Sequence, residues 1–66
     1  NSPAEYVQRV KIEAAKKQLE NTAKNINEVM YDVGYSDAKA FRIAFKKITG
    51  MSPIDYKHKY NRQAAA

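Results

Sequence analysis

The chain has 66 residues, of which 44% are hydrophobic and 29% charged, so it has room for one small core and one domain. It has no cysteine, which excludes disulfides and thiolate metal sites and suits a reducing compartment. The formal net charge is +5, and no apolar run approaches the ~20 residues of a membrane span. With no signal-peptide pattern at its start, we expect a soluble, cytoplasmic domain without membrane partners.

The first expected helix spans residues 2–22. Ser2 stands at the N-cap position, Pro3 at the first helical position, and Glu5 where a capping box needs an acidic side chain. At about 100° per residue, the apolar residues of this segment spread over roughly 240° of the helix circumference. A helix that covers one neighbour needs a narrower apolar arc, so we expect partners on two sides.

A short second helix is expected after residue 25. Asn25 and Glu28 form a second pair of capping residues. Gly34 suits the left-handed conformation that ends a helix. The apolar residues between them recur at helical spacing: Ile26, Val29, Met30 and Val33.

The third expected helix covers about residues 37–49. Ser36 or Asp37 is its N-cap, and Gly50 stops it. One face is apolar, with Phe41, Ala44, Phe45 and Ile48. The opposite face is basic, with Lys39, Arg42, Lys46 and Lys47.

A fourth helix is expected over residues 52–60, starting with Ser52 and Pro53. Residues 61–66 have no apolar face, and we expect them to fray. No segment alternates with period two over four or more residues, which argues against strands. The sequence therefore predicts an all-α fold, a small homeodomain-like helix-turn-helix bundle of about four helices forming one domain over residues 1–66.

The break between the second and third helices has a functional interpretation. Gly34, Tyr35 and Ser36 form a turn so short that the two helices must cross sharply, as in a helix-turn-helix over residues 25–49. That arrangement presents the outer face of its second helix to the major groove of DNA. The alternative is that the basic face is merely a solvated surface.

The charge distribution favours a polyanionic partner. Residues 1–38 carry five basic and six acidic side chains, a net charge of −1, whereas residues 39–66 carry seven and one, a net charge of +6. Nucleic acid and a membrane surface both suit such a charge. Nucleic acid is favoured because the bulky aromatic side chains of the third helix are needed for a compact core.

A short motif occurs twice. "SPAEY" at residues 2–6 recurs as "SPIDY" at residues 52–56. The second copy follows a helix-turn-helix and its closing glycine. We interpret the repeat as a sign that a helix-turn-helix precedes Ser2 as well, so that the chain is half of a tandem pair.

The runs "SPAEYVQRVKIEAAKKQLENT", "INEVMYDVGYSD", "FRIAFKKITG" and "SPIDYKHKY" give the chain a specific resemblance over residues 2–60. It resembles the C-terminal DNA-binding domain of AraC/XylS-type transcription regulators. The resemblance implies two helix-turn-helix units joined by a long linker helix, usually behind an effector-binding or dimerisation domain. This chain would then hold the linker helix, residues 2–22, and the second unit, with double-stranded DNA as its partner.

The same resemblance places the DNA contacts. It implies that Ala38, Lys39, Arg42 and Ile43 face the bases, and that Lys46 and Lys47 hold phosphates. The chain departs from the family pattern in two ways. The family commonly has arginine at Ile43 and a small polar residue at Arg42, which displaces the arginine by one position, and usually has alanine at Met30.

No catalytic, metal or cofactor site is expected. His58 is the only histidine and is expected to be a solvated surface residue. The carboxylates of Glu13 and Glu20, and of Asp32 and Asp37, are likewise expected to be solvated. We expect Tyr6, Tyr56 and Tyr60 to close the core with their hydroxyls in water, and Tyr35 to fill the core beneath the turn.

One alternative function stays open. In this interpretation the chain is a protein-interaction or dimerisation module that uses the apolar face of the helix over residues 2–22. We also expect the isolated fragment to bind DNA weakly and to self-associate through that face.

Overall fold

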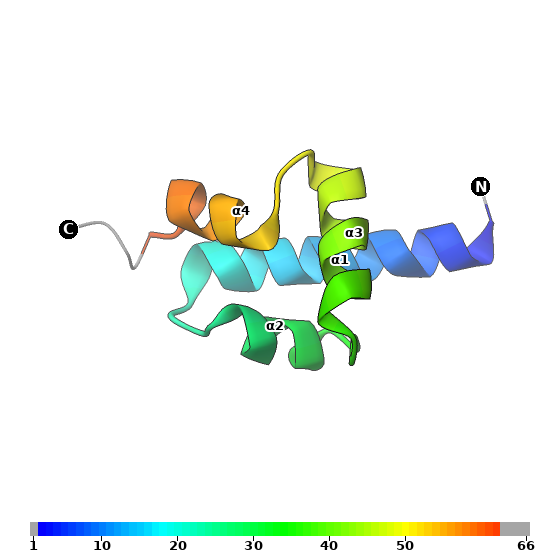
Figure 1. Ribbon diagram of the computed structural model, residues 1–66, viewed down its shortest axis with the longest axis horizontal. Coiled ribbons are helices and arrows are strands. Elements are labelled where there is room, and N and C mark those ends of the chain that lie inside the picture. The colour runs from blue at the N-terminus through cyan, green and yellow to red at the C-terminus, as the bar shows by residue number, and fades with distance from the viewer. Residues whose placement is uncertain (1, 63–66) are drawn as a thin grey trace.

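The computed structural model describes residues 2–62 and shows four α-helices and no strand in that part of the chain (Figure 1). The helices are α1 (Pro3–Asn21), α2 (Ile26–Asp32), α3 (Ala38–Thr49) and α4 (Pro53–Tyr60). The all-α fold expected from the sequence is confirmed. Helix α1, with 19 residues, is the longest.

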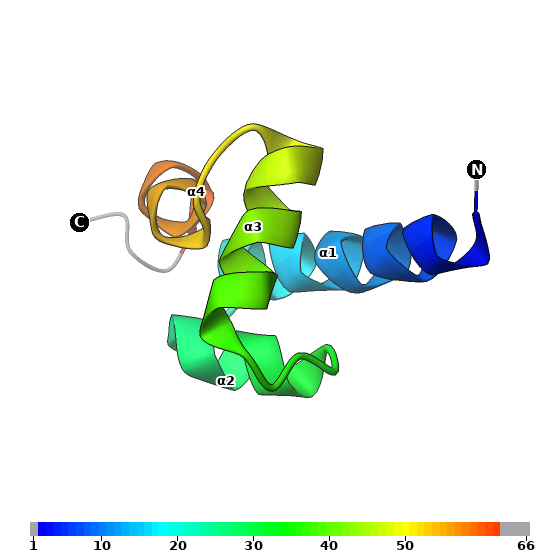
Figure 2. The same ribbon diagram turned by 45° about the vertical axis from the view of Figure 1, so that its right-hand side comes forward.

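The three shorter helices pack on the C-terminal half of α1. Both ribbon views show α3 crossing α1 steeply (Figures 1 and 2), and Figure 1 shows α4 above and α2 below the C-terminal half of α1. The N-terminal half of α1 projects beyond them. The expectation of partners on two sides of α1 therefore applies, within this chain, only to the half nearer Asn21.

The core lies where α3 meets α1. Its aromatic part is a series of rings from the turn to α4, with centroid distances of 5.5 Å from Tyr35 to Phe41, 5.8 Å from Phe41 to Phe45, and 5.4 Å from Phe45 to Tyr56. Such tilted and edge-on contacts add to the stabilisation from burial alone. The buried hydrophobic side chains are Ile12, Ala15, Leu19, Val29, Met30, Phe41, Ala44, Phe45 and Tyr56.

Each helix starts at a capping residue. Side chains of Ser2, Asn25, Asp37 and Ser52 accept hydrogen bonds from backbone N–H groups of the first turns. Among these helices only α2 has a complete capping box. At α1 the Glu5 carboxylate instead accepts a hydrogen bond from the Ser2 hydroxyl. The prediction of a capping box at α1 is therefore wrong.

The end of the fourth helix differs from expectation. Asn61 is buried, and its side-chain amide donates hydrogen bonds to the backbone carbonyls of Leu19 and Thr22. The backbone N–H of Arg62 donates to the Glu20 carbonyl at 2.9 Å. These bonds satisfy carbonyls that the C-terminus of α1 leaves without helical partners. The prediction that fraying starts at residue 61 is therefore wrong for Asn61 and Arg62, and residues 63–66 lie outside the described part.

Two tyrosines and one carboxylate also differ from expectation. The Tyr56 hydroxyl, expected in water, donates a hydrogen bond to the Glu20 carboxylate, expected to be solvated. The pKa of Tyr56 is raised well above its usual range, mainly because the phenol is buried and secondly because of this hydrogen bond. Tyr6 does not close the core, because 69% of it is exposed.

No helix of the described residues combines the length and apolar character needed to cross a membrane.

Candidate nucleic-acid interface

The turn between α2 and α3 follows from one glycine. Gly34 has φ +101°, in the left-handed region that favours glycine. Its N–H donates to the Tyr31 carbonyl at 3.1 Å, and the N–H of Tyr35 donates to the Met30 carbonyl at 3.0 Å. This pair of bonds is the Schellman motif, which ends a helix and reverses the chain sharply.

Side chains from both sides of the turn fix its position. Tyr35 packs inward against Phe41, as expected from the sequence, and the Lys11 ammonium of α1 lies 5.3 Å from the Tyr35 ring centroid. Asp37 then accepts the Lys39 N–H at 3.0 Å and starts α3. The turn is therefore tied to α1 as well as to α3, which fixes the direction in which α3 leaves it.

Helix α3 has one buried and one exposed face. Phe41, Ala44 and Phe45 are buried in the core. The opposite side carries the cation face, which we define as the exposed side chains of Lys39, Arg42, Lys46 and Lys47. Because the apolar and basic residues share one helix, the core contacts that hold α3 in place also direct its cations outward.

No carboxylate neutralises the cation face within residues 2–62. The ion pairs in that part of the chain join Lys16 to Glu13 and Lys24 to Asp32, both away from α3. Lys57 of α4 instead donates to the Lys24 backbone carbonyl at 2.9 Å. The positive potential of α3 is thus available to an external anion.

All six residues expected to contact DNA are exposed and lie on α3. Ala38, Lys39, Arg42 and Ile43 occupy its first two turns, and Lys46 and Lys47 its last turn. They fall on neighbouring parts of the surface, on either side of Arg42. The helical spacing that predicted a shared face is therefore realised.

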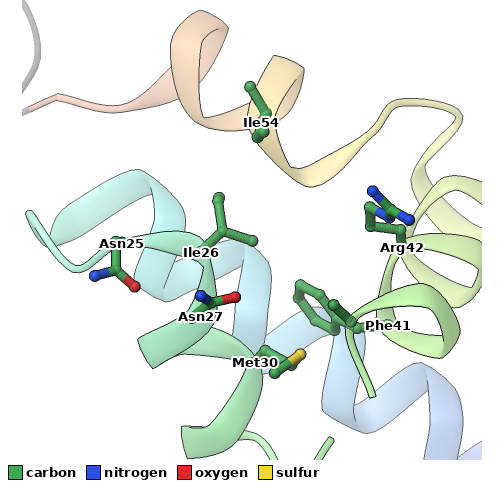
Figure 3. A pocket seen from close by; sticks show the side chains of 8 residues that line it. Asn25, Ile26, Asn27, Met30, Phe41, Arg42 and Ile54 are labelled. Atoms are coloured by element: carbon green, nitrogen blue, oxygen red, sulfur yellow. The ribbon is translucent and has the colours of Figure 1, made fainter. Parts of the chain in front are cut away.

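The structure adds surroundings that sequence reasoning missed. A hollow of about 420 Å³ beside α3 is lined by Ser52 together with Arg42, Ile43, Lys46 and Lys47. A second hollow, of about 510 Å³, lies between α2, α3 and α4 and is bordered by Ala38 and Arg42 (Figure 3). Ser52 carried a signal in the sequence only as a helix cap. Its place beside α3 depends on the turn at Gly50, which has φ +83°.

The residues described hold no cluster of three or more His, Cys, Asp or Glu side chains able to bind a metal ion. His58, considered above as a lone histidine, is exposed on α4.

Known proteins share this sequence pattern. A family profile described as a helix-turn-helix domain matches residues 1–59. A putative AraC-like transcription regulator of Streptomyces lividans is 38% identical over 55 residues, which are 83% of this chain and 18% of that protein. The chain belongs to the AraC-type helix-turn-helix family.

Two further proteins with regulatory names also match the chain. An uncharacterized HTH-type transcriptional regulator, YisR of Bacillus subtilis, is 36% identical over 94% of this chain and 22% of its own length. The bifunctional transcriptional activator/DNA repair enzyme AdaA of the same organism is 42% identical over 80% of the chain and 25% of its own length. No solved structure matches. The chain spans about a fifth of the length of these relatives.

The matches and the fold together describe an AraC-type, DNA-binding transcription-regulator domain. The part of AdaA that this chain resembles is a quarter of that protein.

Proposed function

We propose that this AraC-type domain binds duplex DNA sequence-specifically in the cytoplasm as the second helix-turn-helix of a transcription regulator, with α3 in the major groove. The observation that carries the proposal is the division of α3 into two faces. Its phenylalanines lie in the core, and its cation face is exposed and unpaired within residues 2–62. A rigidly mounted helix with a basic outer face suits the major groove.

The first half of α3 is the part proposed to recognise bases. Arg42 can donate two hydrogen bonds to O6 and N7 of guanine. Ala38 and Ile43 supply methyl groups of the kind that contact thymine. Lys39 lies next to Ala38 and reaches either a base or a phosphate. All four side chains are exposed, so a base edge meets no steric barrier from this chain.

Lys46 and Lys47 are proposed to bind phosphates. Both lie in the last turn of α3, beside the hollow that Ser52 also lines. Contacts to phosphates position a helix without reading sequence. The two halves of α3 therefore have separate roles, and these roles respond differently to mutation.

Selection of binding sites from a pool of random duplexes tests this division. Arg42→Ala should lose the preference at one base pair, at a cost of ~1–3 kcal/mol on the preferred sequence. Lys46→Ala should weaken binding to all sequences about equally. If Arg42→Ala kept both the affinity and the selected sequence, the assignment of α3 as the recognition helix would be wrong.

A second candidate function rests on the N-terminal half of α1. Tyr6, Val7 and Val10 form an exposed apolar face on the projecting part of that helix, which we call the α1 face. We propose that the α1 face docks a first helix-turn-helix unit of the regulator, next to its effector or dimerisation domain. Support comes from the repeated motif, because Tyr56 in the second copy is buried against a helix-turn-helix.

In the isolated chain the α1 face should cause self-association. Sedimentation equilibrium should show dimers at high concentration, and Tyr6→Ser should shift the equilibrium toward monomers. Tyr31→Ser is the matched control, because Tyr31 is a comparably exposed tyrosine on α2. A monomer at all concentrations, or equal effects of the two variants, contradicts the docking role.

A further inference from the structure

The hollow between α2, α3 and α4 has the size and lining of a small-molecule site. Its volume is about 510 Å³, within the ~300–1,000 Å³ typical of ligand pockets. Apolar side chains from all three helices line it: Ile26 and Met30 of α2, Phe41 of α3 and Ile54 of α4. Figure 3 shows Ile26 and Phe41 directed into the same space, with Ile54 across from them.

One charged side chain lines this hollow. Arg42 stands beside Phe41 at the edge of the space (Figure 3), and it is exposed and free of ion pairs within residues 2–62. None of the lining residues is acidic. Asn27 adds an amide on the α2 side. The complementary ligand therefore has a flat apolar body and a single anionic group.

We propose that the hollow binds a small aromatic carboxylate. The ring packs on Ile26 and Ile54, above the buried Met30 and Phe41, and the carboxylate receives two parallel hydrogen bonds from the Arg42 guanidinium. That pairing is the strongest geometry available to an arginine and a carboxylate. The hollow accepts a ligand without opening the core, since Ile54 is 54% exposed and Met30 and Phe41 form a floor that is already buried.

Such a ligand would oppose DNA binding. Arg42 and Ala38 border the hollow and also belong to the surface proposed to face the bases. A carboxylate bound in the hollow occupies the Arg42 guanidinium, which would otherwise pair with guanine. It also places a negative charge near the DNA phosphates. This consequence rests on the proposed function, whereas binding of the carboxylate does not.

Titration of the chain with 2-naphthoate, followed by amide shifts in ¹H–¹⁵N spectra, tests the site directly. We expect saturable shifts concentrated at residues 25–27, 38–42 and 54. The isosteric neutral amide, 2-naphthamide, should bind at least about tenfold more weakly, since a charge-assisted pair is lost. Shifts centred on the α1 face, or equal affinity for the two compounds, would overturn the proposal.

Variants of the chain test which residue binds the carboxylate of the ligand and which contacts its ring. Arg42→Gln should abolish the preference for naphthoate over naphthamide, and Arg9→Gln, which removes an exposed cation of α1, should leave it intact. Ile54→Ser should weaken both compounds, whereas Val10→Ser, at a similarly exposed aliphatic residue, should weaken neither. Equal behaviour within either pair contradicts the site.

Competition with DNA separates the two proposals. At saturating naphthoate, the affinity for the selected duplex should fall at least tenfold, and naphthamide should have a smaller effect. If the chain binds no duplex, the proposed function fails while the spectral titration still decides the site. If naphthoate fills the hollow and DNA affinity is unchanged, the predicted antagonism is wrong.

Discussion

The two copies of the Ser-Pro motif have the same local structure and opposite surroundings. Residues 2–6 and 52–56 each begin a helix with a serine N-cap in extended conformation and a proline in the first turn. Yet Tyr6 is 69% exposed and Tyr56 only 7%. The second copy lies against α1 and α3, while the first lies on the projecting half of α1 (Figure 1).

The comparison separates what a motif determines from what its neighbours determine. The cap and the helix start depend on residues three positions apart, so both copies form them. Burial of the tyrosine depends on which helices pack beside it. The motif therefore starts a helix, and how much it contributes to stability depends on the helices packed around it.

Substituting each of the two tyrosines by alanine should give the largest difference in the free energy of unfolding. Tyr56→Ala removes a buried ring that contacts Phe45, at a cost of ~3–5 kcal/mol, which is comparable to the whole stability of a domain this small. Tyr6→Ala should stay within about 0.5 kcal/mol. Urea denaturation followed by circular dichroism measures both, and equal effects would show that burial does not distinguish the two copies.

Removing the hydrogen bonds that hold the end of α4 on α1 should give the next largest loss of stability. Asn61→Ala leaves the carbonyls of Leu19 and Thr22 without their amide partner, so we expect a loss of ~1–3 kcal/mol. Arg62→Ala is the control, since the bond from residue 62 is made by its backbone N–H. A neutral Asn61→Ala would mean that the end of α4 contributes nothing to stability.

Removing the serine caps should give a smaller difference. Ser52→Ala loses the hydrogen bond from the Asp55 N–H and should cost about 1 kcal/mol of global stability. Ser2→Ala loses the same kind of bond from Glu5, but the first turn of α1 can open locally without disturbing the core. We expect its global effect to be smaller, and the reverse order in urea denaturation would contradict the comparison.

Alkaline pH should sharpen the contrast between the tyrosines. Burial and the Glu20 carboxylate raise the pKa of the Tyr56 phenol above its ordinary value of ~10. The folded state therefore holds this proton more tightly than the unfolded state, so stability is full below about pH 10 and falls as pH rises further. Tyr56→Phe should make this fall shallower and Tyr6→Phe should not, as measured by urea midpoints between about pH 9 and 11.

The helices and both stops were predictable because their signals are local. Asn25 and Asp37 cap helices through bonds to residues two or three positions away, and Gly34 and Gly50 adopt the positive φ for which glycine is suited. The exposed cation face was predictable for the same reason, since at about 100° per residue the cations fall on the side of the helix opposite Phe41 and Phe45.

The contacts that were missed join distant parts of the chain. Tyr56 meets Glu20 across 36 residues, and Asn61 meets the Leu19 carbonyl across 42. Neither pair belongs to a repeating pattern, and Asn61 carries the polar side chain of an ordinary loop residue. The hollow beside Arg42 was missed for a related reason, because it exists only once α2, α3 and α4 have taken their crossing directions.

Salt dependence of duplex binding tests most directly whether the outward cations of α3 are the DNA-binding surface. The logarithm of affinity falls with the logarithm of salt concentration by about 0.9 per phosphate contact, so a few contacts predict a roughly hundredfold loss between about 50 and 200 mM salt. The double variant Lys46→Gln/Lys47→Gln should reduce that slope by about two units, while Arg9→Gln/Lys17→Gln, with the same change of charge on α1, should leave it nearly unchanged. An affinity that does not respond to salt, or equal slopes for the two double variants, would contradict the account.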